Sequence, residues 1–201
     1  MSNSNNKDSN LNNVVLITGA STGIGFSCLE KFLKHDWHVI AHFYENTEKF
    51  KDLIDSYNTN NITPIESDFA NQSSFNKFLN KIKNNNINAL VNSAGVFDHS
   101  KKSNNRINAA KNVFLINTIA PIIIAETVIE KMKKQKKGSI VNISSIGVKY
   151  GSGLDNVFYG TSKIGLEAAT RSLAREGAPF NILVNTLRPG ITDTEFYPKI
   201  G

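Results

Sequence analysis

The sequence predicts an α/β fold, a doubly wound parallel sheet with helices on both faces. After residue 12, short apolar segments typical of strands alternate with longer segments of helical pattern, which indicates consecutive βαβ units. The runs VVLI, INALV and GSIVNI, at residues 14–17, 87–91 and 138–143, are nearly continuous in apolar character. Such runs are expected of strands that are buried on both sides.

Six strands are expected, at residues 13–18, 37–43, 62–66, 88–92, 138–144 and 180–187. Five helices are expected between them, at residues 23–35, 46–58, 71–84, 105–134 and 157–177. Right-handed crossovers and the strand order 3-2-1-4-5-6 would place a ligand crevice beyond the carboxyl ends of the first and fourth strands. The distinctive motifs of the chain follow strand ends, so they are expected to meet at this rim.

Composition favours one domain. The chain has 201 residues, 40% of them hydrophobic, enough for one sizeable core over residues 13–201. Residues 1–12 are polar and rich in asparagine, without the apolar stretch of a secretory signal, and are expected to be a disordered tail. A single cysteine, Cys28, excludes an intrachain disulfide. No run approaches the roughly 20 apolar residues that span a membrane, so a cytoplasmic protein without a membrane partner is expected.

The positive charge of the chain has a local explanation. The net charge is +6 and the pI about 9.3, values that would suit a nucleic-acid-binding protein. The lysines concentrate at residues 131–137, at the end of the longest helical segment and just before Gly138. Cations complement the negative end of a helix dipole, and glycine ends helices. We therefore expect no nucleic-acid partner, and the four histidines have no ligand spacing for a metal.

A glycine-rich turn connects the first strand to the first helix. The segment Gly19–Gly25, GASTGIG, directly follows the apolar run at residues 14–17. Gly19 would allow the tight turn, Gly23 the approach of backbone amides to a pyrophosphate, and Gly25 close packing of helix on strand. The helix N-terminus would direct partial positive charge toward the phosphates. Strand, turn and helix together indicate a dinucleotide site, although the spacing GxxxGxG differs from the common GxGxxG.

Tyr159 and Lys163 form the second motif. They are four residues apart in a helical segment, so their side chains lie on one face, one turn apart. A fixed cation near a tyrosine favours the phenolate and lowers its pKa. A tyrosine in this setting can exchange a proton with a carbonyl or alcohol oxygen near neutral pH. By itself the spacing is also typical of an exposed contact on an amphipathic helix.

Taken together, these motifs resemble the short-chain dehydrogenase/reductase family over nearly the whole chain after Asn12. The matching segments, in order, are TGASTGIG at 18–25, ESDF at 66–69, NSAG at 92–95, Asn117, ISS at 143–145, YGTSK at 159–163 and Pro189-Gly190. The resemblance implies an NAD(P)-dependent oxidoreductase that reduces a ketone or oxidises a secondary alcohol. It also implies a small carbonyl or alcohol substrate, of which an acyl thioester is one candidate.

The resemblance also implies the site residues. The catalytic set would be Asn117, Ser145, Tyr159 and Lys163. Tyr159 would be the general acid or base, Lys163 would tune it and bind the nicotinamide ribose, and Ser145 would stabilise the substrate oxygen. Asn117 would hold a proton-relay water near Lys163, or else be a satisfied polar group of the core. The cofactor site would comprise Gly19, Ser21, Thr22, Gly23, Ile24, Gly25, Phe43, Asp68, Phe69, Asn92, Ala94, Gly95, Tyr159, Lys163, Pro189, Gly190 and Thr194.

Cofactor choice depends on the end of the second strand. NAD-preferring members place an acid there to accept a bond from the ribose 2′-hydroxyl. Phe43 stands at that position and cannot accept it, and the missing carboxylate removes repulsion of a 2′-phosphate. NADP(H) is therefore favoured, with NAD(H) as the alternative, because Thr22 replaces the arginine of many NADP-dependent members. His42, Asn46, Thr47 and Lys49 lie nearby in sequence.

Family members usually continue for about fifty residues beyond the position of Gly201, through a substrate-covering segment and a seventh strand. The seventh strand is therefore expected to be absent, which would leave the sixth strand as an unprotected edge. A nucleotide-binding protein without turnover is the alternative function. A homodimer is expected through the helices at 105–134 and 157–177. Its apolar contacts would come from Ile107, Val113, Phe114, Ile116, Ile119, Leu166, Ala168, Ala169 and Leu173.

Overall fold

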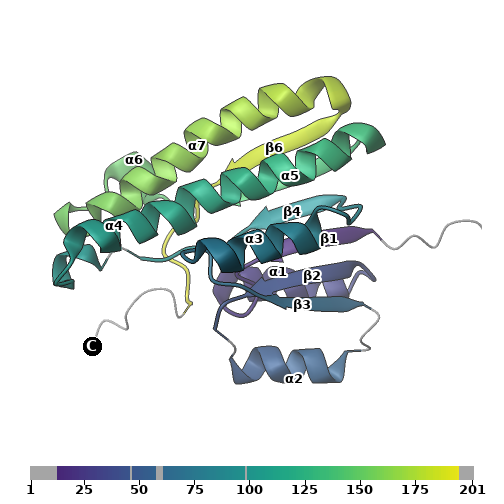
Figure 1. Cartoon of the computed structure of the whole chain (residues 1–201), viewed down its shortest axis with the longest axis horizontal. Helices are drawn as coiled ribbons and strands as arrows, with labels where there is room; N and C mark the ends of the chain where they lie inside the picture. Colours follow the sequence, from purple (N-terminus) through teal and green to yellow (C-terminus); the bar gives the residue numbers. More distant parts are fainter. Residues whose placement is uncertain (1–12, 46, 58–60, 98, 195–201) are drawn as a thin grey trace, which may run out of the picture.

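A six-stranded parallel sheet forms the centre of the molecule (Figure 1). The structure, a computed structural model, describes residues 13–45, 47–57, 61–97 and 99–194. The strand order is β3-β2-β1-β4-β5-β6, and every neighbouring pair is parallel. The predicted fold class and strand order are confirmed. The expected tail, residues 1–12, and Asn46 lie outside the described residues.

The elements match the predicted ranges to within a few residues. The strands are β1 Val14–Thr18, β2 His38–Phe43, β3 Ile62–Glu66, β4 Ala89–Asn92, β5 Gly138–Ile143 and β6 Ile182–Leu187. The α-helices are α1 Gly23–Leu33, α2 Glu48–Ser56, α3 Gln72–Ile82, α4 Arg106–Phe114, α5 Ala120–Gln135, α6 Gly147–Tyr150 and α7 Val157–Gly177. The short helices are η1 Ser100–Lys102, the π-helical η2 Leu115–Ile119, η3 Leu154–Asn156 and η4 Ala178–Phe180.

Two apolar cores lie on the two faces of the sheet. On one face, Leu16 and Ile140 of the sheet pack with Phe78 of α3, Ile124 of α5 and Leu173 of α7. On the other face, side chains of β1 and β2 pack with α1 and α2, centred on Val15, Val39, Leu29 and Phe50. Figure 1 shows α5 and α7 lying side by side on the first face. Alternation along each strand sends consecutive apolar residues into opposite cores, which explains the continuous apolar runs.

The long helix predicted at 105–134 is one helical rod with a π-helical turn in it. The turn spans Leu115–Ile119, between α4 and α5. The side chains of Asn117 and Thr118 bond to Ser162 of α7: the Asn117 amide donates to its hydroxyl at 3.1 Å, and Thr118 donates to its carbonyl at 2.8 Å. π-Bulges are frequent where a helix is shaped for a site, and here the widened turn lies beside the helix that carries Tyr159.

The structure differs from the expected elements in the start of the last strand and in several short helices. The last strand begins at Ile182, not at residue 180, because Ala178–Phe180 form a 3-10 turn that contains Pro179 and ends at Asn181 with a φ of 57°. The short helices η1, α6 and η3 were not predicted. Each has only three or four residues, too few for a periodic pattern.

The rod Arg106–Gln135 is long and apolar enough to cross a membrane. This corrects the expectation that no segment reaches such a length. In the fold, α5 contributes Ile124, Val128 and Ile129 to the core above the sheet. Burial in this core accounts for part of the apolar character of the rod, since core helices and membrane helices pass the same test of composition.

One face of β6 is uncovered by the described residues. Leu183 and Leu187 are 62% and 52% exposed. They pair in register with Ser139 and Ile143 of β5, and Ile143 belongs to the core on the α1 side. Their exposure shows that the α1-side core does not extend over the edge strand.

Candidate active site

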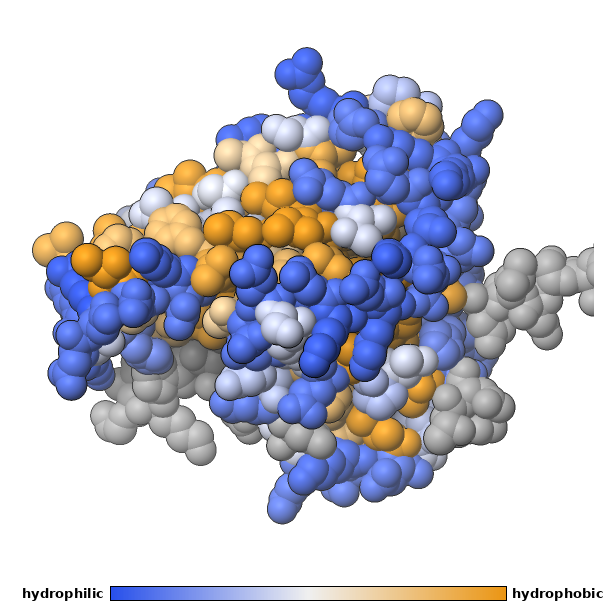
Figure 2. All heavy atoms as spheres, in the orientation of Figure 1, coloured by the Kyte–Doolittle hydropathy of each residue, from blue (hydrophilic) through white to orange (hydrophobic). Residues whose placement is uncertain are grey.

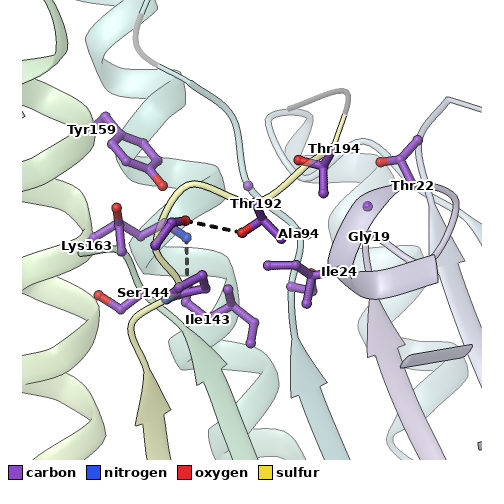
Figure 3. Close-up of a pocket in the computed structure, with 16 residues that line it drawn as sticks. Gly19, Thr22, Ile24, Ala94, Ile143, Ser144, Tyr159, Lys163, Thr192 and Thr194 are labelled. Atoms are coloured by element: carbon purple, nitrogen blue, oxygen red, sulfur yellow. Dashed lines mark hydrogen bonds between the residues drawn. The ribbon is translucent and has the colours of Figure 1, made fainter. Parts of the chain in front are cut away.

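A cavity lies beyond the carboxyl ends of β1, β4 and β5, between the glycine-rich turn and α7 (Figure 3). The segment that follows β6 borders it as well. Its lining consists of Gly19, Thr22, Gly23, Ile24, Ser93, Ala94, Gly95, Ile143, Ser144, Ser145, Tyr159, Lys163, Pro189, Gly190, Thr192 and Thr194. Five motifs that are far apart in the sequence therefore meet at one rim, as the strand order predicts.

The glycines of the turn are required by close contacts. Gly19 and Gly23 have φ values of 67° and 52°, a region that favours glycine. A Cβ on Gly19 would lie 2.8 Å from the Ala94 Cα, and one on Gly25 would overlap the Gly19 carbonyl oxygen. Larger residues would push the turn away from β4 or from α1, so the glycines set the shape of the cavity floor.

The N-terminus of α1 borders this cavity without a side-chain cap. Thr22 is its N-cap residue and accepts no capping hydrogen bond. In contrast, Thr47, Asn71 and Asn105 each accept a hydrogen bond from the first turn of α2, α3 and α4. Uncapped amides with partial positive charge suit an anionic group. The turn and this helix end therefore fit a dinucleotide pyrophosphate.

Tyr159 and Lys163 lie one turn apart on α7 and point into the cavity (Figure 3). Their exposed fractions are only 6% and 4%. The Lys163 Nζ is 5.9 Å from the centre of the Tyr159 ring and donates a hydrogen bond to the Ile143 carbonyl at 2.8 Å. Burial lowers the pKa of Lys163 to about 8, because a low dielectric disfavours the charged form.

The two serines at the end of β5 have different partners. The Ser144 hydroxyl donates to Glu167 Oε1 at 2.8 Å. Glu167 also accepts from Arg188 Nε and Nη2 at 2.7 and 2.6 Å, and the Arg188 guanidinium holds the pKa of that carboxyl below its usual value. Ser145 Oγ instead accepts the Gly147 N–H at 3.1 Å. Accepting this bond leaves the Ser145 hydroxyl hydrogen available to donate, whereas that of Ser144 is used on Glu167, which favours Ser145 for contact with a substrate oxygen.

Asn117 is fully buried and does not line the cavity. Its Oδ1 accepts the Val96 N–H at 2.8 Å, and its Nδ2 donates to the Val96 carbonyl at 2.9 Å and to Ser162. The side chain therefore ties the segment after β4 to α7, which agrees with the reading of a satisfied core amide. A role in proton relay stays a prediction.

Several predicted cofactor residues lie outside this cavity. Phe69 is buried in the core, and the Asn92 side chain points inward, where it donates to Pro121 and Asn142. Asp68 follows β3 and accepts the Ala70 N–H at 2.8 Å. Phe43 packs against Phe50, with ring centres 5.0 Å apart. The remaining two are Ser21, which lines a neighbouring hollow, and Gly25, which lies beneath the turn.

Four cavity residues were absent from the predicted site: Ser93, Ile143, Ser144 and Thr192. The first three were quoted only as parts of strand-end motifs. Thr192 lies two residues after the Pro189-Gly190 turn, where its hydroxyl donates to the Gly190 carbonyl at 3.2 Å. The position of these four residues at a strand end or in the segment that follows one was the available signal, since such residues can border the crevice.

Comparison with known proteins identifies the family. A family model described as short chain dehydrogenase matches residues 13–201, so the chain belongs to the short-chain dehydrogenase family. It is 32% identical over 186 residues to the 3-oxoacyl-(acyl-carrier-protein) reductase FabG of Aquifex aeolicus, covering 90% of this chain and 75% of that protein.

Solved structures with the same fold include complexes with nicotinamide dinucleotides. A 4-hydroxyisoleucine dehydrogenase complexed with NADH aligns with a TM-score of 0.82 and 27% identity, covering 94% of this chain and 77% of that one. ElxO with NADP bound aligns with a TM-score of 0.76 and 29% identity, covering 92% and 76%. Both nicotinamide dinucleotides thus occur among its structural relatives.

We predict that Lys163→Met stabilises the protein at pH 7 by about 2 kcal/mol. The shift from 10.5 to about 8 corresponds to roughly 3 kcal/mol, from which the lost bond to Ile143 is subtracted. Because the folded pKa is lowered, the cost is fully present below pH 8 and is relieved as the pH rises toward 10.5.

Urea unfolding at pH 7 and 9.5 measures this effect. The advantage of Lys163→Met over the natural chain should shrink at the higher pH. The control is Lys77→Met, at an exposed lysine of α3, which should show neither effect. A Lys163→Met protein less stable than the natural chain at pH 7 contradicts the prediction.

Proposed function

We propose that this protein is an NADP(H)-dependent oxidoreductase that reduces a ketone or oxidises a secondary alcohol. The observation that carries the proposal is that Ser145, Tyr159 and Lys163 line the same cavity as the glycine-rich turn. A proton donor, a buried cation and a pyrophosphate cradle are thus within one site. Membership of the short-chain dehydrogenase family supports this reading.

Each side chain has a role that follows from its surroundings. The cofactor, when bound, supplies or accepts the hydride. Tyr159 gives its phenolic proton to the developing alkoxide in reduction and takes it back in oxidation. The Lys163 ammonium, held against Ile143, stabilises the phenolate that remains. Ser145 donates its hydroxyl proton in a hydrogen bond to the same substrate oxygen.

We predict that Tyr159→Phe lowers turnover by at least ~10² while the NADPH dissociation constant changes less than a few-fold. Phenylalanine keeps the packing of the ring against Phe97, whose centre lies 5.2 Å away, and removes only the proton donor. Nicotinamide fluorescence measures binding, and a carbonyl panel that includes a 3-oxoacyl thioester measures turnover.

Near-natural activity of the Tyr159→Phe variant would exclude Tyr159 from the chemistry. Binding of NADPH by the natural chain without turnover of any carbonyl would instead favour a nucleotide-binding protein without an enzymatic role. Measuring binding and turnover on the same preparation separates the two outcomes.

The preference for NADP(H) is proposed from Phe43. Its side chain packs on Phe50 at the end of β2 and offers no carboxylate to a ribose 2′-hydroxyl. The hollow beside the turn, bordered by Thr22, is lined by Lys31 and Lys49 and also by Glu48 and Asp193. Because these charges balance, the absence of an acid at position 43 is the stronger support.

We predict that NADPH binds more tightly than NADH to the natural chain, and that Phe43→Asp reverses the order. A carboxylate at residue 43 would accept the 2′-hydroxyl and repel a 2′-phosphate, with an effect of about tenfold. Phe43→Asn is the control, because it removes the same packing without adding charge and should keep the natural order. Tighter binding of NADH to the natural chain in direct titration would refute the preference.

We further propose a homodimer through the α4–α5 rod and α7. Figure 2 shows apolar side chains gathered over these helices. Ile107, Ile119 and Ile164 are 70%, 43% and 51% exposed. Val113, Leu166 and Leu173, expected at this interface, are instead buried within the protomer.

Light scattering should give the mass of a dimer, because a two-fold axis would cover this apolar surface with its own copy. Ile119→Glu should shift the chain to monomer, and Leu183→Glu, on the exposed face of β6, serves as the control. A monomeric natural chain would refute the interface.

A further inference from the structure

His42 lies in the second strand with both ring nitrogens engaged. The side chain is 3% exposed. Its Nδ1 is 3.2 Å from the Gly19 backbone nitrogen, and its Nε2 is 3.0 Å from the Ser67 carbonyl oxygen. The ring therefore bridges the first glycine of the turn after β1 and the residue that follows β3.

The two partners fix the protonation of the ring. A backbone N–H can only donate, so Nδ1 must be the unprotonated acceptor for Gly19. A carbonyl can only accept, so Nε2 must carry the proton that is donated to Ser67. An imidazolium would place an N–H of the ring against the N–H of Gly19. Burial lowers the pKa of His42 to about 4, which agrees with a ring that stays neutral.

Packing holds the ring in this position. His42 stacks on Phe69, with ring centres 3.9 Å apart and planes 11° apart. The Phe78 ring, on α3, meets the His42 ring in an edge-to-face arrangement with ring centres 5.2 Å apart. The His42 carbonyl also accepts the Ala20 N–H at 2.8 Å. One residue of β2 therefore holds two consecutive amides of the glycine-rich turn, one through its side chain and one through its backbone.

We propose that His42 is a positioning residue for the cofactor: its neutral imidazole ties Gly19 to the end of β3 and so holds the glycine-rich turn in its binding shape. The inference rests on the proposed function. Gly19 packs directly against Ala94 on the opposite side, so a turn released from His42 loses its support on the β2 side. Affinity for the dinucleotide then depends on His42, while the proton-transfer groups on α7 do not touch it.

Two substitutions separate the hydrogen bonds from the packing. His42→Phe keeps an aromatic ring beside Phe69 and removes both bonds. We expect its NADPH dissociation constant to rise about tenfold, whereas kcat at saturating cofactor changes much less. His42→Asn offers a side-chain oxygen near the place of Nδ1, which can accept the Gly19 N–H, and should recover much of the affinity. Phe78→Leu is the packing control and should lower stability without weakening NADPH binding.

Nitrogen NMR of the histidine-labelled natural chain provides a readout that needs no variant. The Nε2–H tautomer of His42 should be present at pH 7 and persist at pH 5. An Nδ1–H tautomer or an imidazolium at pH 7 would overturn the proposal that His42 accepts the Gly19 N–H and positions the turn.

Failure of the two proposals can be distinguished. Equal NADPH affinity of the natural chain and a folded His42→Phe variant would overturn the role of His42 alone. If the natural chain binds neither NADPH nor NADH, the proposed function fails, and the role of His42 in positioning a cofactor fails with it.

Discussion

The hydroxyl of Thr18 joins the two halves of this fold. At the end of β1 it accepts the backbone N–H groups of Ser93 and Ala94, both at 3.1 Å. The order of strands reverses between β1 and β4, so their carboxyl ends diverge into the loops that form the crevice. The Thr18 bonds hold these loops together at the point of divergence, and the contact of Gly19 with Ala94 depends on this closeness. Without it the glycine-rich turn and the helix that carries Tyr159 and Lys163 would not border the same cavity.

A buried polar network extends this junction to α7. The Asn92 side chain donates to Asn142 Oδ1 at 2.9 Å, and Asn142 donates to Thr170 on α7, also at 2.9 Å. Buried amides are costly unless they are paired, and paired networks specify one arrangement. Here the chain of bonds runs from β4 through β5 to the helix that carries Tyr159 and Lys163. The network fixes the height of α7 above the sheet and hence the depth of both side chains in the cavity.

The site contains an energetic conflict that the fold tolerates. Lys163 is buried and binds a carbonyl, not a carboxylate, so its charge remains poorly compensated. A carboxylate partner would favour the ammonium but would also neutralise its effect on Tyr159. Glu167, one turn further along α7, is instead occupied by Arg188 and Ser144. The Lys163 ammonium therefore lies near Tyr159 without a carboxylate partner among the described residues, while Glu167 is bound by Arg188 and Ser144.

The sequence alone determined the fold class, the strand order and the motifs at the rim, because these depend on local properties. Apolar runs, glycine at positive φ and the four-residue spacing of Tyr159 and Lys163 are written in short segments. Only the tertiary structure decided what each polar side chain bonds to. Asn117 was expected in the catalytic set and Asn92 at the cofactor, yet both amides point into the interior and join elements there. His42 seemed only a neighbour of the cofactor position, because the bond to Gly19 and the stack on Phe69 link residues more than twenty positions apart. Such contacts arise from the packing of β2 between β1 and β3, which no local pattern records.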